Sequence, residues 1–189
     1  MYRCLTTQQF DDTAGFTLLP LRYEDIESIR IWRNAQIDIL RQKTPIDSEQ
    51  QIHYYNHVIR PSFAEEHPSQ ILFSFLKNKI CIGYGGLVHI NWESKHAEIS
   101  FLLDPIYLSD PTVYRQTFSH YLALLKHVGF LDLHLHRLFA ETYEFRVDHI
   151  ATLESAGFQF EGRLRDHIFK RGKWEDSIIH GLISSEEHS

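Results

Sequence analysis

Two spacings of apolar residues alternate along the chain, and together they predict a mixed α/β protein. Apolar residues that recur every three or four positions predict four helices, over residues 23–34, 47–60, 111–130 and 148–156. Short apolar or alternating runs predict seven strands, over residues 16–21, 71–76, 80–90, 97–103, 138–143, 158–169 and 174–183. Short polar turns separate the second, third and fourth strands, so these three are expected to form an antiparallel meander. Helices and strands do not alternate strictly, which argues against a Rossmann-type sheet.

The stretch from Ala97 to Phe130 is the centre of the predicted fold. Its strand is almost wholly apolar, as expected in the middle of a sheet, and it ends before Pro105. A helix is expected to start at Ser109–Thr112, where a hydroxyl or carboxylate can cap it and Pro111 takes the first position. Free backbone N–H groups and the helix dipole converge at such a start, which predicts an anion site there.

Composition narrows the class of protein. The 189 residues, 43% of them apolar, suffice for one globular domain, expected over residues 16–185. Residues 1–15 are expected to be a loose leader or an edge segment. The net charge of −6 argues against nucleic acid as a partner, and no apolar run reaches the roughly 18 residues of a membrane span. Two cysteines are too few for a disulfide framework and favour a cytoplasmic location, while the 13 scattered histidines predict no metal site.

Several stretches carry a resemblance to one family. They are Leu19-Pro20-Leu21 with Glu24-Asp25 and Trp32-Arg33-Asn34, Ile82-Gly83-Tyr84-Gly85-Gly86 followed by Ala97–Pro105, Leu135–Leu138, Leu153–Phe158 with Glu161–Asp166, and Gly172–Ser177. With the order of elements, they resemble the GNAT-type N-acetyltransferase superfamily. Within it, the likeness is to the branch of ribosomal-protein N-terminal acetyltransferases and UDP-amino-sugar N-acetyltransferases. The resemblance implies a mixed, mostly antiparallel twisted sheet of about seven strands flanked by about four helices.

The resemblance also implies that acetyl-CoA is the co-substrate. It would lie where the fourth and fifth strands splay apart, with backbone N–H groups of Phe101, Leu102 and Leu103 holding the thioester carbonyl and the pantetheine arm. The pyrophosphate would lie on the turn that opens the long helix.

The chain departs from the family at this turn, because Ser109–Thr117 contains no glycine. Two alternatives follow. Either a modified loop holds the cofactor through Arg115 and the N–H groups of the segment Tyr114, Arg115, Gln116 and Thr117, or cofactor binding is weakened or lost. Arg146 and His149 replace the family's asparagine and serine at the start of the short helix, and Arg146 either reaches a phosphate or is a solvated loop arginine.

Transfer of an acetyl group requires a base, since the acceptor ammonium must lose a proton before it attacks. Glu98, on the central strand, is the first candidate, acting directly or through water. The alternative is a structural glutamate paired with Lys95 or Arg137. His89, at the end of the preceding strand, is the second candidate, although a lone strand histidine is more often structural. The family's general-acid tyrosine is replaced by Leu153, so solvent or another residue would protonate the leaving thiolate.

Aromatic and polar side chains of the first two helices and the meander turn could line the acceptor pocket. These residues are Trp32, Arg33, Asn34, His53 and Trp92. Aromatic rings with an arginine suit a nucleotide sugar, although Trp32 is equally well explained as a core residue. The predicted function is acetyl transfer to a primary amine, most plausibly a nucleotide-linked amino sugar in surface-polysaccharide synthesis. The alternatives are a protein N-terminal or peptide amine as acceptor, or a degenerate binding module that has lost the cofactor. A homodimer formed through the final hairpin is plausible.

Overall fold

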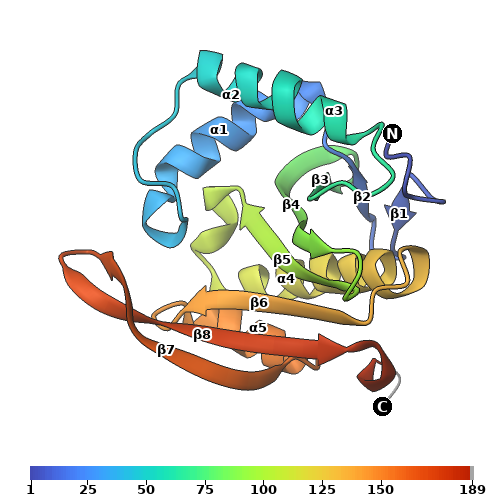
Figure 1. The fold of residues 1–189 in the computed structure, drawn as a ribbon. Coiled ribbons are helices and arrows are strands. Elements are labelled where there is room, and N and C mark those ends of the chain that lie inside the picture. The colour runs from blue at the N-terminus through green and yellow to red at the C-terminus, as the bar shows by residue number, and fades with distance from the viewer. Residues whose placement is uncertain (188–189) are drawn as a thin grey trace.

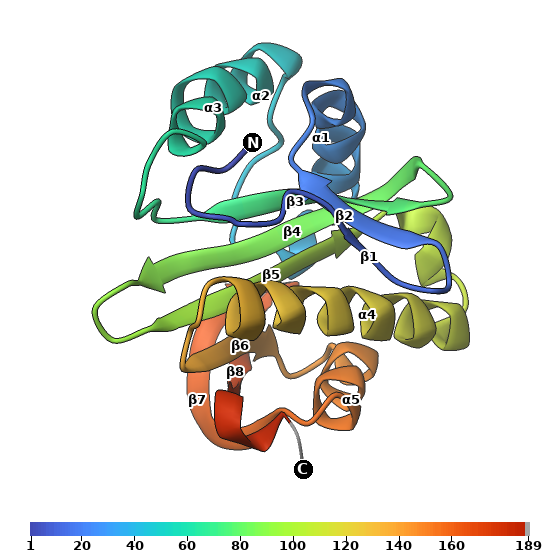
Figure 2. The ribbon, with the colours of Figure 1, turned by 90° about the vertical axis from the view of Figure 1, so that its right-hand side faces the viewer.

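A twisted sheet runs through the molecule, with helices packed on both of its faces (Figures 1 and 2). The computed structural model describes residues 1–187. The strand order is β1-β2-β3-β4-β5-β6-β8-β7, and all neighbours pair antiparallel except β5 and β6. The helices α1, α2 and α3 cover one face, and α4 and α5 cover the other. The predicted fold is therefore confirmed.

The strands are β1 (Phe10–Asp11), β2 (Phe16–Pro20), β3 (Ile71–Lys77), β4 (Ile80–Asn91), β5 (His96–Leu103), β6 (Arg137–Tyr143), β7 (Gln159–Lys170) and β8 (Lys173–Ile183). The helices are α1 (Ile26–Ala35), α2 (Ser48–Tyr54), α3 (Arg60–Ser62), α4 (Pro111–Lys126) and α5 (Val147–Ser155). A π-helical segment, His127–Asp132, prolongs α4. A 3-10 turn, Ile37–Ile39, follows α1.

One predicted helix end is wrong. Pro61 was expected to end the second helix, yet the chain continues through a π-helical turn, Tyr55–Ile59, into α3, with Pro61 in its first turn. Proline is tolerated in a first turn because its missing N–H would have no helical partner there. The wider turns of the preceding π-helix also interrupt the regular α-helical hydrogen-bond pattern before Pro61.

The first fifteen residues, expected to be a leader or an edge segment, pack onto the sheet. Tyr2, Leu5 and Phe10 are all buried, and Phe10 belongs to the edge strand β1. The Tyr2 hydroxyl accepts a 2.7 Å hydrogen bond from the backbone N–H of Leu72. These residues therefore share the core that contains β3 and α4.

Alternation along β5 divides the core between the two faces of the sheet. Phe101 and Leu103 belong to the cluster beneath α4 and α5, whereas Leu102 belongs to the cluster beneath α1 and α2. Successive side chains of a strand point to opposite faces, which explains this division. The central strand is thus anchored on both sides, as the apolar run of its sequence predicted.

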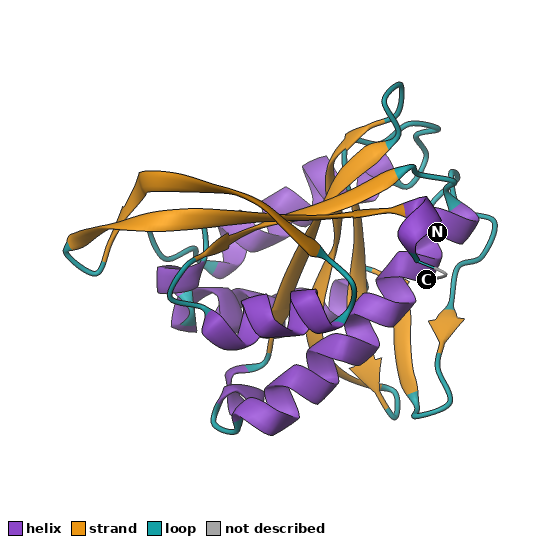
Figure 3. Ribbon diagram, turned by 90° about the horizontal axis from the view of Figure 1, so that it is seen from below, coloured by secondary structure: helices purple, strands orange, loops and turns teal. Residues whose placement is uncertain are grey.

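The final hairpin, β7 with β8, projects from the body of the protein (Figure 3). Its outer strand β7 forms an edge of the sheet. The hairpin exposes Phe160, Phe169 and Trp174, each 58–60% accessible. The homodimer predicted from the sequence would use this surface. Among residues 1–187, no helix combines the length and apolar character needed to cross a bilayer.

Candidate active site

A cleft opens where β5 and β6 separate. The two strands pair only from His96 to Glu98 on β5, opposite residues 137–139 of β6, and then diverge. The space between them, here called the transfer cleft, has a volume of about 210 Å³. It is lined by β5 from Glu98 to Leu102, by β6, by the start of α5 and by residues 39–42. Beyond Glu98, alternate N–H groups of β5 face this opening without a strand partner in β6.

Glu98 lies at the apex of the cleft and is only 7% exposed. Its carboxylate accepts two hydrogen bonds from Arg41, with Nη2–Oε1 at 2.7 Å and Nη1–Oε2 at 3.1 Å. Its partner is therefore Arg41, neither Lys95 nor Arg137 as the structural alternative had it. Arg41 also reaches Glu141 on β6, with 3.0 Å between Nη2 and Oε2.

The two residues predicted to act as bases lie together. Nδ1 of His89 is 2.7 Å from Oε2 of Glu98, while the imidazole remains two-thirds exposed to solvent. His89 has a φ of +50° and lies where the pairing of β4 with β5 shifts register. A non-glycine residue in this conformation stores strain, and a bulge turns a side chain away from its regular direction. Here the distortion directs His89 toward Glu98. Their roles as bases stay predictions.

The start of α4 offers no free anion site, which corrects the first expectation. Asp110 accepts hydrogen bonds from the N–H groups of Thr112 at 2.8 Å and Val113 at 3.4 Å. Pro111 has no N–H, and the N–H of Tyr114 bonds to the Asp110 carbonyl at 2.9 Å. The helix start is therefore satisfied by its own cap, and the N–H groups at 114–117 lie inside the helix.

A second cavity, the helix-end pocket, lies beside the capped start of α4. It measures about 340 Å³ and shares Ile39, Arg146 and His149 with the transfer cleft. Arg171, from the turn of the β7–β8 hairpin, faces it across Phe145, with Cζ 4.3 Å from the ring centroid. Two guanidinium groups, which suit phosphate, thus lie beside the helix start where the resemblance predicted the pyrophosphate. Arg115 lines neither cavity and pairs with Asp148 at 2.6 Å.

A buried polar cluster joins the transfer cleft to the helix-end pocket. Tyr114 Oη lies 2.7 Å from Nδ1 of His149, and Arg146 Nη2 lies 3.2 Å from the same nitrogen. Burial, with a smaller contribution from Arg146, lowers the pKa of His149 well below its usual value. The imidazole is therefore neutral at pH 7. Burial also raises the pKa of Tyr114, so its phenol remains a donor.

The depressed pKa of His149 predicts acid sensitivity. The unfolded chain takes up a proton at His149 below about pH 6.5, whereas the native protein does not. The free energy of unfolding should therefore fall by about 1.4 kcal/mol per pH unit below pH 6.5 through this residue. Urea unfolding of His149→Gln between pH 7 and pH 5 should show a flatter pH dependence than wild type. The exposed His57→Gln is the matched control, and equal slopes for wild type and His149→Gln would contradict the prediction.

A third cavity, the glutamine pocket, lies between α1, α2 and the sheet. It measures about 390 Å³ and meets the transfer cleft at Arg33, Tyr84 and Ser100. Its other polar lining residues are Gln50, Gln51, Tyr54 and Gln70. Gln51 as a whole residue is only 6% exposed, and within residues 1–187 its side-chain amide makes no hydrogen bond and stays open to the pocket. No carboxylate among the described residues lines this pocket.

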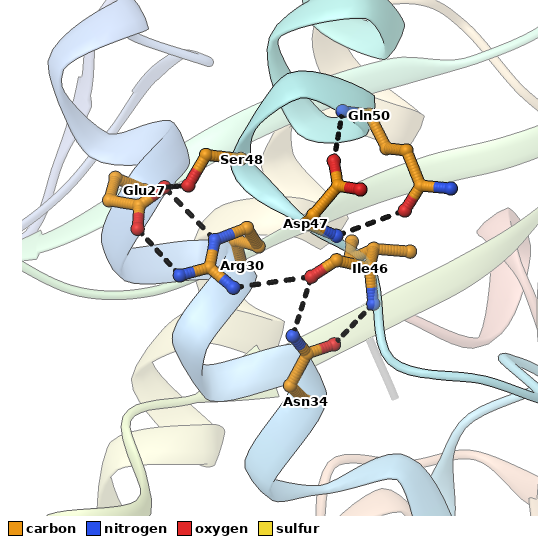
Figure 4. Close-up of polar contacts among 7 residues, drawn as sticks. All are labelled: Glu27, Arg30, Asn34, Ile46, Asp47, Ser48 and Gln50. Atoms are coloured by element: carbon orange, nitrogen blue, oxygen red, sulfur yellow. Dashed lines mark hydrogen bonds and ion pairs between the residues drawn. The ribbon is translucent and has the colours of Figure 1, made fainter.

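Polar contacts fix the wall of the glutamine pocket before any ligand binds (Figure 4). Asn34 on α1 accepts from the N–H of Ile46 at 3.0 Å and donates to its carbonyl at 2.7 Å. Asp47 and Gln50 then form a capping box at the start of α2. Since Gln51 is in the first turn of α2, its position depends on this junction.

The other residues predicted for the site are dispersed. Trp32 is buried in the core beneath α1, His53 is exposed on α2, and Trp92 bonds to the Pro68 carbonyl at the far end of β4. Leu103 is buried in the core, Thr117 is buried on α4, and Gln116 is exposed on that helix. None of them lines the three cavities.

Sequence reasoning missed Glu141, Gln51 and Arg171 as site residues. A carboxylate inside the apolar strand 138–143 was a usable signal for Glu141. Gln51 and Arg171 carry no comparable signal, since each lies in a polar segment.

Comparison with known proteins agrees with this geometry. The model of the acetyltransferase (GNAT) domain family matches residues 18–179. No curated protein matches the chain by sequence. Among solved structures, spermidine N-acetyltransferase from Vibrio cholerae in complex with CoA and spermine is similar, with a TM-score of 0.78, 20% identity, 94% of this chain covered and 100% of that one. Mutant forms of the spermidine/spermine N-acetyltransferase SpeG from the same organism give a TM-score of 0.74 at 20% identity, with 93% and 98% covered. A dodecameric spermidine N-acetyltransferase structure from that organism gives 0.72 at 20% identity, with 92% and 96% covered.

The splayed sheet and the cleft define an acyl-transfer fold, and the chain belongs to the GNAT acetyltransferase family. It is an N-acetyltransferase, and acetyl-CoA is its acetyl donor. The residues present fit this donor, because unpaired N–H groups of β5 face the transfer cleft and two arginines line the adjoining helix-end pocket.

Proposed function

We propose that the protein acetylates the primary amine of an amino sugar, carried on a nucleotide as the sequence predicted. The supporting observation is the glutamine pocket, whose amides and hydroxyls can exchange hydrogen bonds with the hydroxyls of a sugar ring. Gln51 carries most weight, since its amide makes no hydrogen bond within the described residues and is open to the pocket, where it can bind a ligand hydroxyl. Arg33, at the junction of this pocket with the transfer cleft, suits the phosphates of a nucleotide.

In this proposal Glu98 takes the proton from the acceptor ammonium, directly or through one water. An ionised carboxylate offers about four lone-pair sites, and the three hydrogen bonds from Arg41 and His89 leave one on Oε1. His89 gives the proton an exit, because it joins Glu98 to solvent. The free amine nitrogen then attacks the thioester carbonyl carbon, the carbon–sulfur bond breaks, and the thiolate takes up a proton. The unpaired N–H groups of β5 stabilise the oxyanion.

A polyamine is the second candidate acceptor, and a specific observation favours it. Two carboxylates, Glu98 and Glu141, lie at the transfer cleft, and the similar solved structures are spermidine N-acetyltransferases. At 20% identity the likeness to those structures concerns the fold. The lining of the transfer cleft opposes a polycation, because three arginines outnumber the two glutamates.

The experiment compares acceptors directly. Release of CoA thiol is measured with acetyl-CoA and, in turn, a UDP-linked amino sugar, spermidine and a peptide with a free α-amine. We expect the amino sugar to give the highest kcat/KM. Gln51→Leu should raise the KM for the amino sugar about fivefold, because it removes one neutral hydrogen bond, and should leave the KM for acetyl-CoA unchanged. The exposed Gln9→Leu is the matched control. A higher kcat/KM for spermidine or the peptide, or no turnover at all, would overturn the proposal.

A further inference from the structure

The guanidinium of Arg41 occupies the space between two carboxylates that come from different strands. It makes two hydrogen bonds to Glu98 on β5 and one, at 3.0 Å, to Glu141 on β6. Glu98 is buried, and the side chain of Glu141 is 16% exposed. We propose that Arg41 selects acceptors according to their charge. Its guanidinium fills the subsite that the second ammonium of a polyamine would need. The enzyme is therefore restricted to monoamines. This inference rests on the proposed function, because it concerns the acceptor side of the same cleft.

Exchange of Arg41 for a ligand ammonium would bring no electrostatic gain. Both groups carry one positive charge, but the guanidinium matches a carboxylate with two parallel hydrogen bonds, which an ammonium cannot reproduce. Ejecting Arg41 also breaks its contact with Glu141. A diamine or triamine therefore meets carboxylates that are already neutralised, in a cleft whose formal charge is positive.

The segment that carries Arg41 is held on both sides by hydrogen bonds to other elements. On one side, Nζ of Lys170, at the end of β7, donates to the carbonyls of Ile37 at 3.0 Å and Leu40 at 2.8 Å. On the other side, Gln42 accepts from Arg33 at 2.9 Å and donates to Asn34 at 2.9 Å. Because residues on both sides of Arg41 are fixed to other elements, its guanidinium is preorganised between the glutamates. Figure 1 shows the hairpin tip beside the turn that follows α1.

Spermidine is the probe, and its dissociation constant is measured by calorimetry at pH 8 without acetyl-CoA. We expect weak binding to wild type and at least about tenfold tighter binding to Arg41→Gln, which uncovers two carboxylates. Arg41→Lys keeps the charge and should bind as weakly as wild type. The double variant Arg41→Gln with Glu141→Gln should lose most of the gain. Equal affinity for wild type and Arg41→Gln, or an equal gain in Arg41→Lys, would overturn the proposal.

A second variant keeps the test valid if Arg41→Gln does not fold. Lys170→Gln releases one side of the segment while leaving all charges of the cleft in place, and it should tighten spermidine binding in the same direction by a smaller factor. No change in this variant would then count against the proposal. Because the readout is binding, its result is independent of acetyl transfer. If the amino sugar is not acetylated but Arg41→Gln gains spermidine affinity, the proposed function fails and the role of Arg41 stands.

Discussion

Replacement of Glu98 by glutamine should lower kcat/KM for the amine acceptor about 100-fold or more, the usual contribution of a positioned general base. Glutamine keeps the size of the side chain but cannot take up a proton. It also leaves Arg41 with one buried partner fewer, so thermal unfolding must be measured alongside activity. The KM for acetyl-CoA should change little, because Glu98 lies at the apex of the transfer cleft, away from the helix-end pocket.

Two readouts separate catalysis from a structural role for Glu98. An acceptor whose amine is already largely unprotonated at the assay pH should recover part of the rate lost in Glu98→Gln, because it does not need the base, whereas a purely structural defect would slow every acceptor equally. His89→Gln, which removes only the exit to solvent, should produce a smaller loss than Glu98→Gln. The exposed Glu65→Gln is the matched control for exchange of a carboxylate for an amide. Activity of Glu98→Gln within threefold of wild type would rule Glu98 out as the base.

Replacement of both Arg146 and Arg171 by glutamine should raise the KM for acetyl-CoA about 100-fold. Each guanidinium can make a charge-assisted hydrogen bond to phosphate, worth about 1.5–3 kcal/mol. Each single variant should therefore raise the KM about tenfold. The two arginines converge on the helix-end pocket from the residue before α5 and from the hairpin turn, which places them beside the capped start of α4.

A truncated donor makes this test specific. S-acetylpantetheine lacks the pyrophosphate, so its KM should be the same for wild type and the double variant. If both donors are affected equally, the arginines support the structure rather than the phosphates. The same measurement on Arg115→Gln decides between the two positions for the phosphates. A larger effect at Arg115 than at Arg146 would favour the loop predicted from the sequence.

The candidate site shows how far local sequence patterns extend. The apolar run of β5 and the position of Glu98 within it were sufficient to predict a buried carboxylate on the central strand. The order of the elements then placed His89 on the neighbouring strand, and the two side chains are in contact. The cap at the start of α4 could also have been predicted from the sequence, because an aspartate before proline accepts hydrogen bonds from the N–H groups that a phosphate would need.

By itself, the sequence determined the elements, their order and the central place of β5, since these depend on periodicity and on turn residues a few positions apart. Only the tertiary structure decided the partner of Glu98, because Arg41 belongs to an irregular segment 57 residues away whose path no local pattern specifies. The glutamine pocket and the convergence of Arg146 and Arg171 on the helix-end pocket likewise arise from packing between distant elements. Burial and charge at such sites are properties of the assembled fold, because each depends on groups that meet only after the chain has closed around them.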